Sequence, residues 1–212
     1  VQHLKPNDYV ELTGLDGMEP DSADFLNGRH VLRAVRTDLG GVVVKGYVPY
    51  TAGHVYTDAE KFPTVSLVIP HLDYVTACDN RLWGCRYGLS VDGQFVNEIY
   101  ATALGDMSRW HTYSDGSYAD NAWTAGVSHM GEFTGAVTYG GRPYFFKADR
   151  IYSVYGTDPS SFGYNELVEK GVQAGSDRSL CVVDGTLYYK AADDVVAFNG
   201  SYTTVVSDAL GR

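Results

Sequence analysis

Apolar and polar residues alternate along this chain in short runs separated by turn residues, a pattern that indicates β-strands with one covered face. In the first run, Val10 and Leu12 share one face, while Glu11 and Thr13 lie on the other. No apolar repeat of helical period continues for four turns, and the best helical candidate, residues 161–170, is short. The sequence therefore predicts an all-β protein.

Two segments toward the C-terminus are similar to each other, residues 141–156 and 185–200. Their offset is 43 residues before a tight acidic turn and 44 after it. The alignment matches Tyr144 with Leu187, Lys147-Ala148 with Lys190-Ala191, Ile151 with Val195, and Gly156 with Gly200. Each copy has the pattern of a strand, a turn and a second strand. A period of roughly 40–45 residues filled with strands is typical of propeller blades or of a stacked β array, whose units need neighbours to cover their apolar faces.

The strands divide into two predicted domains. Residues 1–62 hold four or five short strands, with turn signals at Asn27-Gly28 and Gly40-Gly41, and predict a small β-barrel of SH3-like size. Residues 63–212 predict blade-like antiparallel sheets of a partial β-propeller, with about three blade units. The first unit comprises strands at 74–78, 81–87 and 98–104, with a turn at Asp79-Asn80. Since three units are fewer than a closed propeller needs and the chain begins at Val1, we expect it to be part of a longer protein.

The chain is acidic. It carries 16 Lys and Arg residues against 26 Asp and Glu residues, which gives a formal net charge of −10. Because non-specific DNA binding depends on basic residues that neutralise phosphates, tight nucleic-acid binding is not expected. The sequence also lacks a run of 18 apolar residues, so no membrane span is predicted.

The three cysteines, Cys78, Cys85 and Cys181, form no close pair in the sequence. An odd number without a pair is a poor disulfide framework and indicates a reducing compartment. Cys78 and Cys85 lie in apolar, strand-like surroundings and are predicted to be small core residues. Since no His-x-His or Cys-x-x-Cys pattern accompanies them, no metal site and no cofactor are predicted.

Sequence patterns that would indicate catalysis are missing. Glycoside hydrolysis requires two carboxylates that face a cleft. Nothing in their spacing pairs the available carboxylates, which are Glu98, Asp106, Asp115, Asp120, Glu132 and Asp149. Ser128-His129 lacks the Gly-x-Ser-x-Gly turn that would present a nucleophile. The sequence therefore predicts no catalytic residue.

Two polar stretches, residues 112–131 and 157–170, are predicted to be loops that make subunit contacts. The candidate contact residues are Tyr113, Tyr118, Trp123, Phe162 and Tyr164. Exposed Tyr and Trp side chains anchor protein interfaces and also stack on sugar rings. In a β protein the same residues also serve as core residues or cross-strand pairs, so both interpretations stay open.

Several segments together resemble one group of proteins. They are residues 79–88 (Asp-Asn-Arg-Leu-Trp-Gly-Cys-Arg-Tyr-Gly) and 97–106 with Trp110, then 145–147 with 154–156, 171–176, and 188–190 with 198–200. This pattern resembles bacteriophage and prophage virion proteins, whose propeller-like segment is similar to the tail hub or nozzle proteins of short-tailed phages. The resemblance covers most of residues 65–212 and, more weakly, residues 4–50. It implies no catalytic residue.

The resemblance implies a non-enzymatic structural component of a phage or prophage virion, in the tail or the head–tail connector. Its partners would be other virion proteins, with identical copies forming a ring. It would be located in the virion, and in the bacterial cytoplasm during assembly. The alternative is a carbohydrate-binding module for host-surface recognition, which requires an exposed Trp or Tyr platform, so burial of Trp83, Trp110 and Trp123 would argue against it. A glycosidase is the third and weakest candidate.

Overall fold

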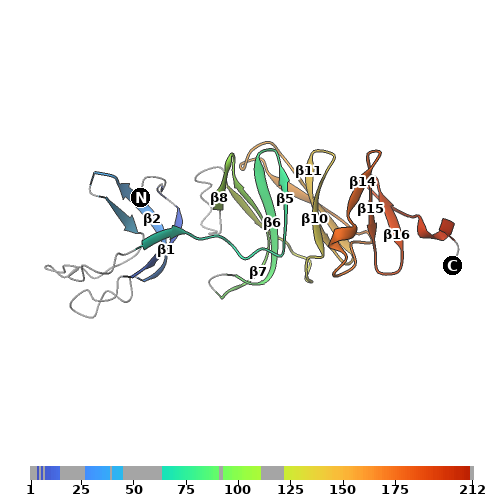
Figure 1. Cartoon of the computed structure of the whole chain (residues 1–212), viewed down its shortest axis with the longest axis horizontal. Helices are drawn as coiled ribbons and strands as arrows, with labels where there is room; N and C mark the ends of the chain where they lie inside the picture. Colours follow the sequence, from blue (N-terminus) through green and yellow to red (C-terminus); the bar gives the residue numbers. More distant parts are fainter. Residues whose placement is uncertain are drawn as a thin grey trace. The chain divides into compact units, whose positions relative to one another are not determined.

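The computed structural model describes residues 4, 6, 8–14, 27–38, 40–44, 64–90, 93–110 and 122–210. Contacts divide the chain into two compact units, Val1–Ile69 and Pro70–Arg212, called unit 1 and unit 2 below (Figure 1). Regular structure within the described ranges consists of β-strands and two short 3₁₀ turns, η3 (Asp177–Ser179) and η4 (Ser207–Leu210). The predicted all-β class is confirmed. No helix in these ranges has the length and apolar character needed to cross a membrane.

Unit 1 contains one antiparallel sheet in its described residues. In spatial order its strands are β3 (Gly41–Val44), β2 (Gly28–Arg36), β1 (Tyr9–Thr13) and β4 (Thr64–Leu67). The buried apolar residues of this sheet and its flanks are Val10, Val31, Leu32 and Val68. Within the described part, β3 and β4 do not pair with each other, so the small barrel expected for residues 1–62 stays a prediction.

Two details of unit 1 differ from the sequence expectation. Gly28 lies opposite Leu12 in the ladder between β1 and β2, so it is a strand residue and not the second residue of a two-residue turn. Strand β4 pairs with β1, with Leu12 opposite Val65. Because of this pairing the contacts divide the chain after Ile69, whereas the sequence placed the boundary after residue 62.

Unit 2 contains, in its described residues, three antiparallel sheets that follow one another along the chain (Figure 1). Sheet 1 has the order β5 (Tyr74–Cys78), β6 (Arg81–Leu89), β7 (Phe95–Ala103) and β8 (Asp106–Trp110), and β9 (Trp123–Gly126) also pairs with β7. Sheet 2 has the order β10 (Gly135–Tyr139), β11 (Arg142–Lys147), β12 (Arg150–Tyr155) and β13 (Gly163–Leu167). Sheet 3 has the order β14 (Cys181–Val183), β15 (Thr186–Lys190), β16 (Val195–Phe198) and β17 (Thr203–Val205).

Two apolar cores hold the three sheets together. The core between sheets 1 and 2 includes Trp83, Cys85, Ile99, Phe145 and Tyr152. The core between sheets 2 and 3 includes Tyr144, Phe146, Ile151, Leu187, Tyr189, Val196 and Phe198. Successive residues of β11 enter opposite cores, because side chains alternate between the two faces of a strand. Each sheet thus has a leading face toward the position of the preceding sheet and a trailing face toward the position of the next.

Neighbouring sheets are also linked at the edge where the chain enters them. The Thr138 hydroxyl in β10 donates a hydrogen bond of 2.7 Å to the Ala77 carbonyl in β5, and it lies 2.9 Å from the Thr76 hydroxyl. At the end of β10, the Tyr139 hydroxyl donates a 2.7 Å bond to the Gly185 carbonyl, just before β15. The same edge therefore joins sheet 1 to sheet 2 and sheet 2 to sheet 3.

A two-residue turn connects the first two strands of each sheet in unit 2. These turns are Asp79-Asn80, Gly140-Gly141 and Asp184-Gly185, and their residues all have positive φ, from 48° to 76°. Positive φ at both central positions is the type I′ geometry, which matches the right-handed twist of the flanking strands. Gly, Asn and Asp adopt this backbone region more readily than other residues. The turn predicted at Asp79-Asn80 is confirmed.

The internal repeat corresponds to sheets 2 and 3, with a one-residue correction in its first strand. Phe145 pairs with Tyr152 in sheet 2, and Tyr189 pairs with Val196 in sheet 3, so both strands keep an offset of 44 residues. The sequence alignment was wrong by one residue because it matched the two lysines that follow the aromatic runs. In the structure, Lys190 lies one position before the equivalent of Lys147. The corrected equivalents of Tyr144 and Lys147 are Tyr188 and Ala191, in place of Leu187 and Lys190.

Two predicted elements are wrong. Residues 161–170 do not form a short helix but contain β13, which pairs with β12 through Tyr152 and Glu166. The predicted loop 112–131 contains β9, where Trp123 lies opposite Ala101 of β7. Strand β13 is an edge strand of sheet 2, and β9 pairs only with β7 in the described part. Each strand carries too few apolar residues to show a clear alternation of apolar and polar positions. Residues 112–121 of that loop lie outside the described residues.

Candidate interaction surfaces

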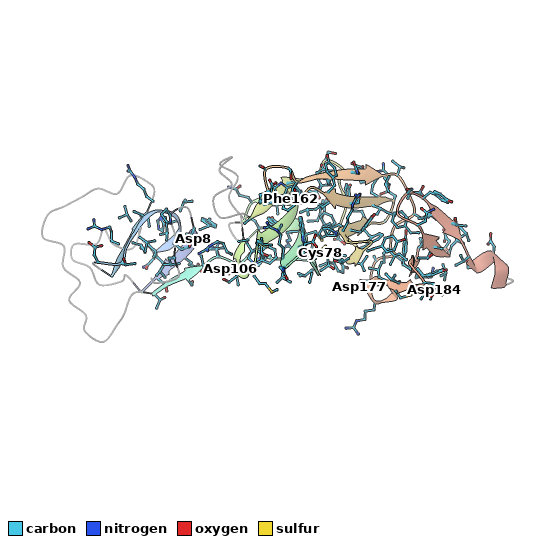
Figure 2. The ribbon with its side chains drawn as sticks, turned by 90° about the horizontal axis from the view of Figure 1, so that it is seen from above. Asp8, Cys78, Asp106, Phe162, Asp177 and Asp184 are labelled. Carbon is cyan, nitrogen blue, oxygen red and sulfur yellow. The ribbon has the colours of Figure 1, made fainter. Side chains whose placement is uncertain are left out.

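Trp123, one of the predicted contact residues, belongs to the core between sheets 1 and 2. Its ring centroid lies 6.1 Å from that of Trp83 and 5.8 Å from that of Phe162, both in edge-to-face geometry. Trp123 is only 3% exposed. Phe162, labelled in Figure 2, packs against the same core and lies 5.0 Å from Trp83. These rings stabilise the join between sheets and leave little surface for a partner.

The remaining predicted contact residues have different positions. Tyr164 on β13 is partly buried, its ring lies 5.8 Å from that of Tyr152, and its hydroxyl donates a 3.0 Å bond to the Gly126 carbonyl. This bond connects sheet 2 to β9 of sheet 1. Tyr113 and Tyr118 lie outside the described residues.

The three tryptophans of the chain are all buried. Trp83 and Trp123 are 3% exposed, and Trp110 is 8% exposed. A sugar-stacking platform requires an open ring face, so tryptophan cannot supply one here. The large exposed aromatic side chains in the described part lie far apart in the sequence: Phe95 on β7, Tyr155 on β12 and Tyr202 just before β17.

The exposed part of the second predicted contact loop is held by one carboxylate. Asp158 accepts hydrogen bonds from the amides of Ser160 and Ser161 at 3.0 and 3.2 Å, and from the Ser160 hydroxyl at 2.5 Å. These bonds, the Ser160 hydroxyl first, hold the pKa of Asp158 below its ordinary value. Residues 157–161 therefore form an ordered polar turn on the surface of sheet 2.

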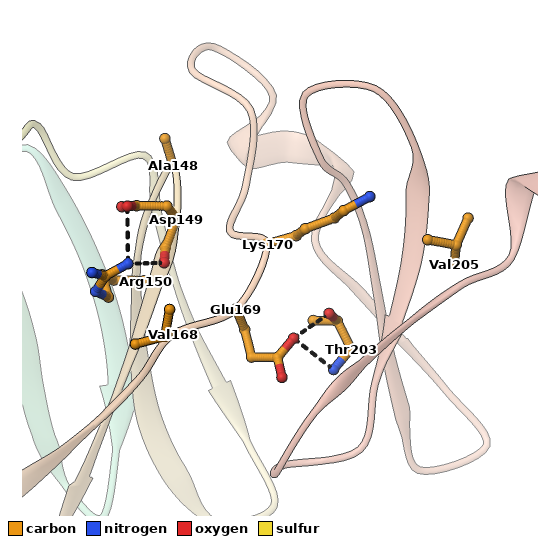
Figure 3. A pocket seen from close by; sticks show the side chains of 8 residues that line it. All are labelled: Ala148, Asp149, Arg150, Val168, Glu169, Lys170, Thr203 and Val205. Carbon is orange, nitrogen blue, oxygen red and sulfur yellow. Dashed lines mark hydrogen bonds and ion pairs between the residues drawn. The ribbon is translucent and has the colours of Figure 1, made fainter.

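A shallow groove lies between the outer parts of sheets 2 and 3 (Figure 3). Its lining residues are Ala148, Asp149, Arg150, Val168, Glu169, Lys170, Thr203 and Val205. Arg150 donates to Asp149 at 2.9 Å and to Glu166 at 3.0 Å. Glu169 accepts from both the amide and the hydroxyl of Thr203.

The charges of this groove are therefore already engaged within the protein. Lys170 also forms an ion pair with Asp194, which raises the pKa of Lys170. Lysine and arginine alternate with carboxylates along the groove, so it presents no excess of either sign. These residues are therefore better suited to hold two sheets together than to bind a charged small molecule.

A second groove lies between sheets 1 and 2, beside their type I′ turns. Asp79, Arg81, Trp83, Arg142 and Tyr155 contribute to its lining. Arg81 is 4% exposed and donates a 2.7 Å hydrogen bond to the Thr102 carbonyl. Its guanidinium also lies 5.3 Å from the centre of the Phe162 ring. Burial lowers the pKa of Arg81, while Asp158 and Asp79 oppose that effect.

Lys147 is a buried cation that the sequence did not reveal as a special residue. It is 1% exposed, and its ammonium donates to the Asn97 Oδ1 at 2.8 Å and to the His129 carbonyl at 2.5 Å. The rings of Phe133, Tyr87 and Tyr152 lie at 4.7, 5.1 and 5.9 Å from Nζ. Burial lowers the pKa of Lys147 to about 8. A lysine directly after the apolar run Pro143-Tyr-Phe-Phe was the available signal.

The bonds of Lys147 connect the two sheets. Lys147 belongs to β11 of sheet 2, whereas Asn97 belongs to β7 of sheet 1. Asn97 in turn donates from Nδ2 to the carbonyls of Val127 and His129, at 2.7 and 2.9 Å. We call this group of Lys147, Asn97 and the His129 carbonyl the lysine clamp. It joins sheets 1 and 2 through hydrogen bonds inside an aromatic enclosure.

Three of the carboxylates considered for catalysis, Glu98, Asp106 and Asp149, are engaged in local bonds, while Asp115 and Asp120 lie outside the described residues. Glu98 accepts a 2.5 Å bond from the Tyr100 hydroxyl, and Asp106 accepts from Ser108 and Arg109. The Asp149 carboxylate lies 3.2 Å from His129 Nε2. Among the residues that the structure describes, no group of three His, Cys, Asp or Glu side chains could hold a metal ion.

The cysteines occupy the predicted environments. Cys78 and Cys85 are buried in the core between sheets 1 and 2, as predicted, and burial raises the pKa of both thiols. Cys181 is a free and exposed thiol on β14.

Comparison of the chain with protein-family models and with curated proteins gives no match. Function is therefore inferred from the residues, from the arrangement of the sheets, and from the resemblance described above.

Proposed function

We propose that this protein is a non-enzymatic structural component of a phage or prophage virion, in the tail or the head–tail connector. The observation that carries the proposal is the stack of three like sheets, each with a two-residue turn of positive φ after its first strand, joined by hydrogen bonds from β10 to both neighbouring sheets. A stack of this kind is a rigid support that presents turns and edges to neighbouring subunits. The resemblance of residues 65–212 to virion proteins is the reason to place this structural role in a phage or prophage particle.

In this proposal the three sheets of unit 2 are blades of a β-propeller. Propeller blades are four-stranded sheets arranged around an axis, with the first strand of each blade nearest that axis. The first strand of sheet 2 contacts the first strand of sheet 1, from Thr138 to Ala77, and the first turn of sheet 3, from Tyr139 to Gly185, and these contacts favour this arrangement. The sheet of unit 1 would then be part of a small β-barrel that precedes the blades.

The side chains favour a mechanical role over a chemical one. The charged residues of the groove in Figure 3 are used in ion pairs and hydrogen bonds within the protein. The aromatic residues predicted to make contacts, Trp123 and Phe162, instead hold sheets 1 and 2 together. Contacts with neighbouring virion proteins would be made by the exposed turn at 157–161 and by sheet edges, with identical copies arranged as a ring.

Deletion and complementation test this proposal. Deleting the coding sequence from the source phage or prophage should prevent formation of intact particles, and the wild-type chain supplied in trans should restore them. A chain carrying Asp149→Asn and Glu169→Gln, which removes both carboxylates lining the groove, should also restore them. An enzymatic role would be favoured by a different pair of results. In it, the folded double variant does not restore particles, while an extract with only trace amounts of the wild-type chain does. Normal yields of infectious particles after the deletion would reject the proposal.

A further inference from the structure

The turn between β16 and β17 contains an asparagine followed by a glycine. This pair of residues occurs twice in the chain, at Asn27-Gly28 and at Asn199-Gly200. Asn199 is exposed, and its backbone amide donates to the Tyr202 carbonyl at 3.4 Å, which closes a tight turn over residues 199–202. An asparagine side chain in such a turn lies close to the backbone nitrogen of the next residue, because only three bonds separate its Cγ atom from the backbone carbonyl carbon.

Two backbone amides hold the side chain of Asn199. Its Oδ1 accepts a hydrogen bond from the Ser201 amide at 3.0 Å and another from the Tyr202 amide at 3.1 Å. Both donors draw electron density from the side-chain carbonyl, so its Cγ atom becomes a better target for a nucleophile. The same two donors also stabilise this oxygen when it gains negative charge, as backbone amides do in an oxyanion hole.

The nucleophile nearest to this carbon is the backbone nitrogen of Gly200. Among the hydrogen bonds of the described residues, none uses the Gly200 amide as a donor. Gly200 has a φ of 99° and carries no side chain that would obstruct a ring formed through its nitrogen. The turn therefore combines an unengaged nucleophile with a polarised amide group.

We propose that Asn199 is a site of spontaneous deamidation and isoaspartate formation in the folded protein. A base from solvent removes the proton of the Gly200 amide while its nitrogen attacks Cγ of Asn199, and Nδ2 leaves as ammonia with a proton from water. The product is a cyclic succinimide. Water then opens the ring, which gives aspartate if the new bond breaks and isoaspartate if the original peptide bond breaks. The reaction consumes one water molecule and involves no oxidation or reduction.

The other asparagine–glycine pair is protected by its sheet. Gly28 lies opposite Leu12 in the ladder between β1 and β2. Leu32 donates a backbone hydrogen bond of 2.8 Å to the Asp8 carbonyl, and hydrogen-bonded pairs alternate along an antiparallel ladder. The pair of Leu12 and Gly28 is therefore a hydrogen-bonded one. Its glycine amide becomes available to attack a side chain only after local opening of the sheet.

The reaction at Asn199 changes charge and backbone beside the contact between sheets 2 and 3. Either product adds one negative charge, and isoaspartate also inserts a methylene group into the main chain of the turn. Strand β17 begins directly after this turn at Thr203, which pairs with Phe198 and donates to Glu169 (Figure 3). Isoaspartate should therefore displace β17 and weaken its bonds to Glu169. This slow change is independent of any role in virions.

Peptide mapping by mass spectrometry of the aged full-length chain tests the proposal. The chain is incubated in mildly alkaline buffer, once folded and once in urea, and conversion of Asn199 and Asn27 is followed with time. In the folded chain Asn199 should convert at least about tenfold faster than Asn27, because the Gly28 amide first requires local opening. In urea the two sites should convert at similar rates. Fragmentation that distinguishes the two products should find both aspartate and isoaspartate at position 199.

Two results would overturn the proposal. One is an intact Asn199 in the folded chain while the chain in urea converts. The other is an equal rate at both sites in the folded chain, because the reaction would then follow the sequence and not the structure.

Hydrogen exchange tests the effect on β17. The amides of this strand should exchange faster in the aged wild type than in the fresh protein. Asn199→Gln, whose longer side chain closes the ring less readily, should show no such change with age. Asn199→Asp carries the charge without the extra methylene group and should exchange more slowly than the aged wild type. Unchanged exchange in an aged chain that contains isoaspartate would overturn the displacement of β17.

Discussion

Replacing Lys147 by methionine should remove a specific pH dependence of stability. Methionine has a similar length and fills the aromatic enclosure of the lysine clamp, but it carries no charge and donates no hydrogen bond. The clamp includes Asn97 Oδ1 at 2.8 Å and the His129 carbonyl at 2.5 Å. The carbonyl of His129 keeps a bond from Asn97 Nδ2 after the substitution, so only Asn97 Oδ1 loses its protein donor.

The magnitude follows from the pKa of the lysine. Burial lowers this pKa from 10.5 to about 8, so between these values the unfolded chain binds more protons than the folded chain. The free energy of unfolding of the wild-type protein therefore rises with pH across this window, through the contribution of Lys147. The full window corresponds to at most about 3 kcal/mol, and the interval from pH 8 to about pH 9.5 to about 1.5 kcal/mol. Well below pH 8, where the lysine is protonated in both states, the contribution is constant.

Urea denaturation followed by tryptophan fluorescence measures this difference. The three tryptophans lie at 83, 110 and 123, so their fluorescence reports on unit 2. The free energy of unfolding of the wild type, minus that of Lys147→Met, should increase by about 1.5 kcal/mol from pH 8 to about pH 9.5. Titration of tyrosines and cysteines is common to both proteins and largely cancels in the difference.

Lys190→Met is the matched control, because it makes the same change in net charge at a partly exposed lysine on sheet 3. The difference caused by Lys147→Met should increase more with pH over the same interval than the difference caused by this variant. If Lys147→Met gave a constant difference, the ammonium would not be desolvated by the fold, and the lysine clamp would be refuted.

Three further substitutions test the packing of unit 2. Gly171→Ala should lower the free energy of unfolding by about 3 kcal/mol, because the new Cβ would overlap the Lys147 carbonyl oxygen; Gly126→Ala, with open space around it, is the control for the same urea assay. Asp184→Gly should raise the denaturation midpoint slightly, by about 0.5 kcal/mol in stability, since residue 184 has a φ of 48°; a loss of stability would contradict strain at that turn. Trp123→Ala should lower the free energy of unfolding by about 3–5 kcal/mol in calorimetric or urea unfolding, because the ring is buried. An unchanged midpoint would instead indicate that Trp123 is a surface contact residue.

The parts of the fold predicted from sequence are those in which local chemistry leaves few choices. Asp79-Asn80 forms a type I′ turn because these residue types tolerate positive φ, and the flanking strands then pair as a hairpin. Cys78 and Cys85 are buried, as expected for small apolar residues within the apolar and polar alternation of their strands. The repeat could be recognised because sheets 2 and 3 each pack on a preceding sheet, so their strands have similar patterns of apolar residues.

The errors occurred where tertiary pairing determines the structure. Strand β13 contains Asn165 and Glu166 and covers only part of one face, so its residues show no period of two. Trp123 lies in a segment rich in polar residues, and only pairing with β7 brings it into the core. The lysine clamp could not be predicted because Asn97 and Lys147 are 50 residues apart in the sequence. Which long-range partners meet depends on the stacking of sheets, which a local pattern does not contain.

Quantitative mass spectrometry of purified particles tests the central claim most directly. Particles from the source phage or prophage are banded on a density gradient, and peptides from unit 2 are counted against a coat protein of known copy number. The account predicts this protein in intact particles at a fixed number of several copies, as a ring of structural subunits requires. Its absence from intact particles, with the protein found only in the surrounding lysate, would contradict the account.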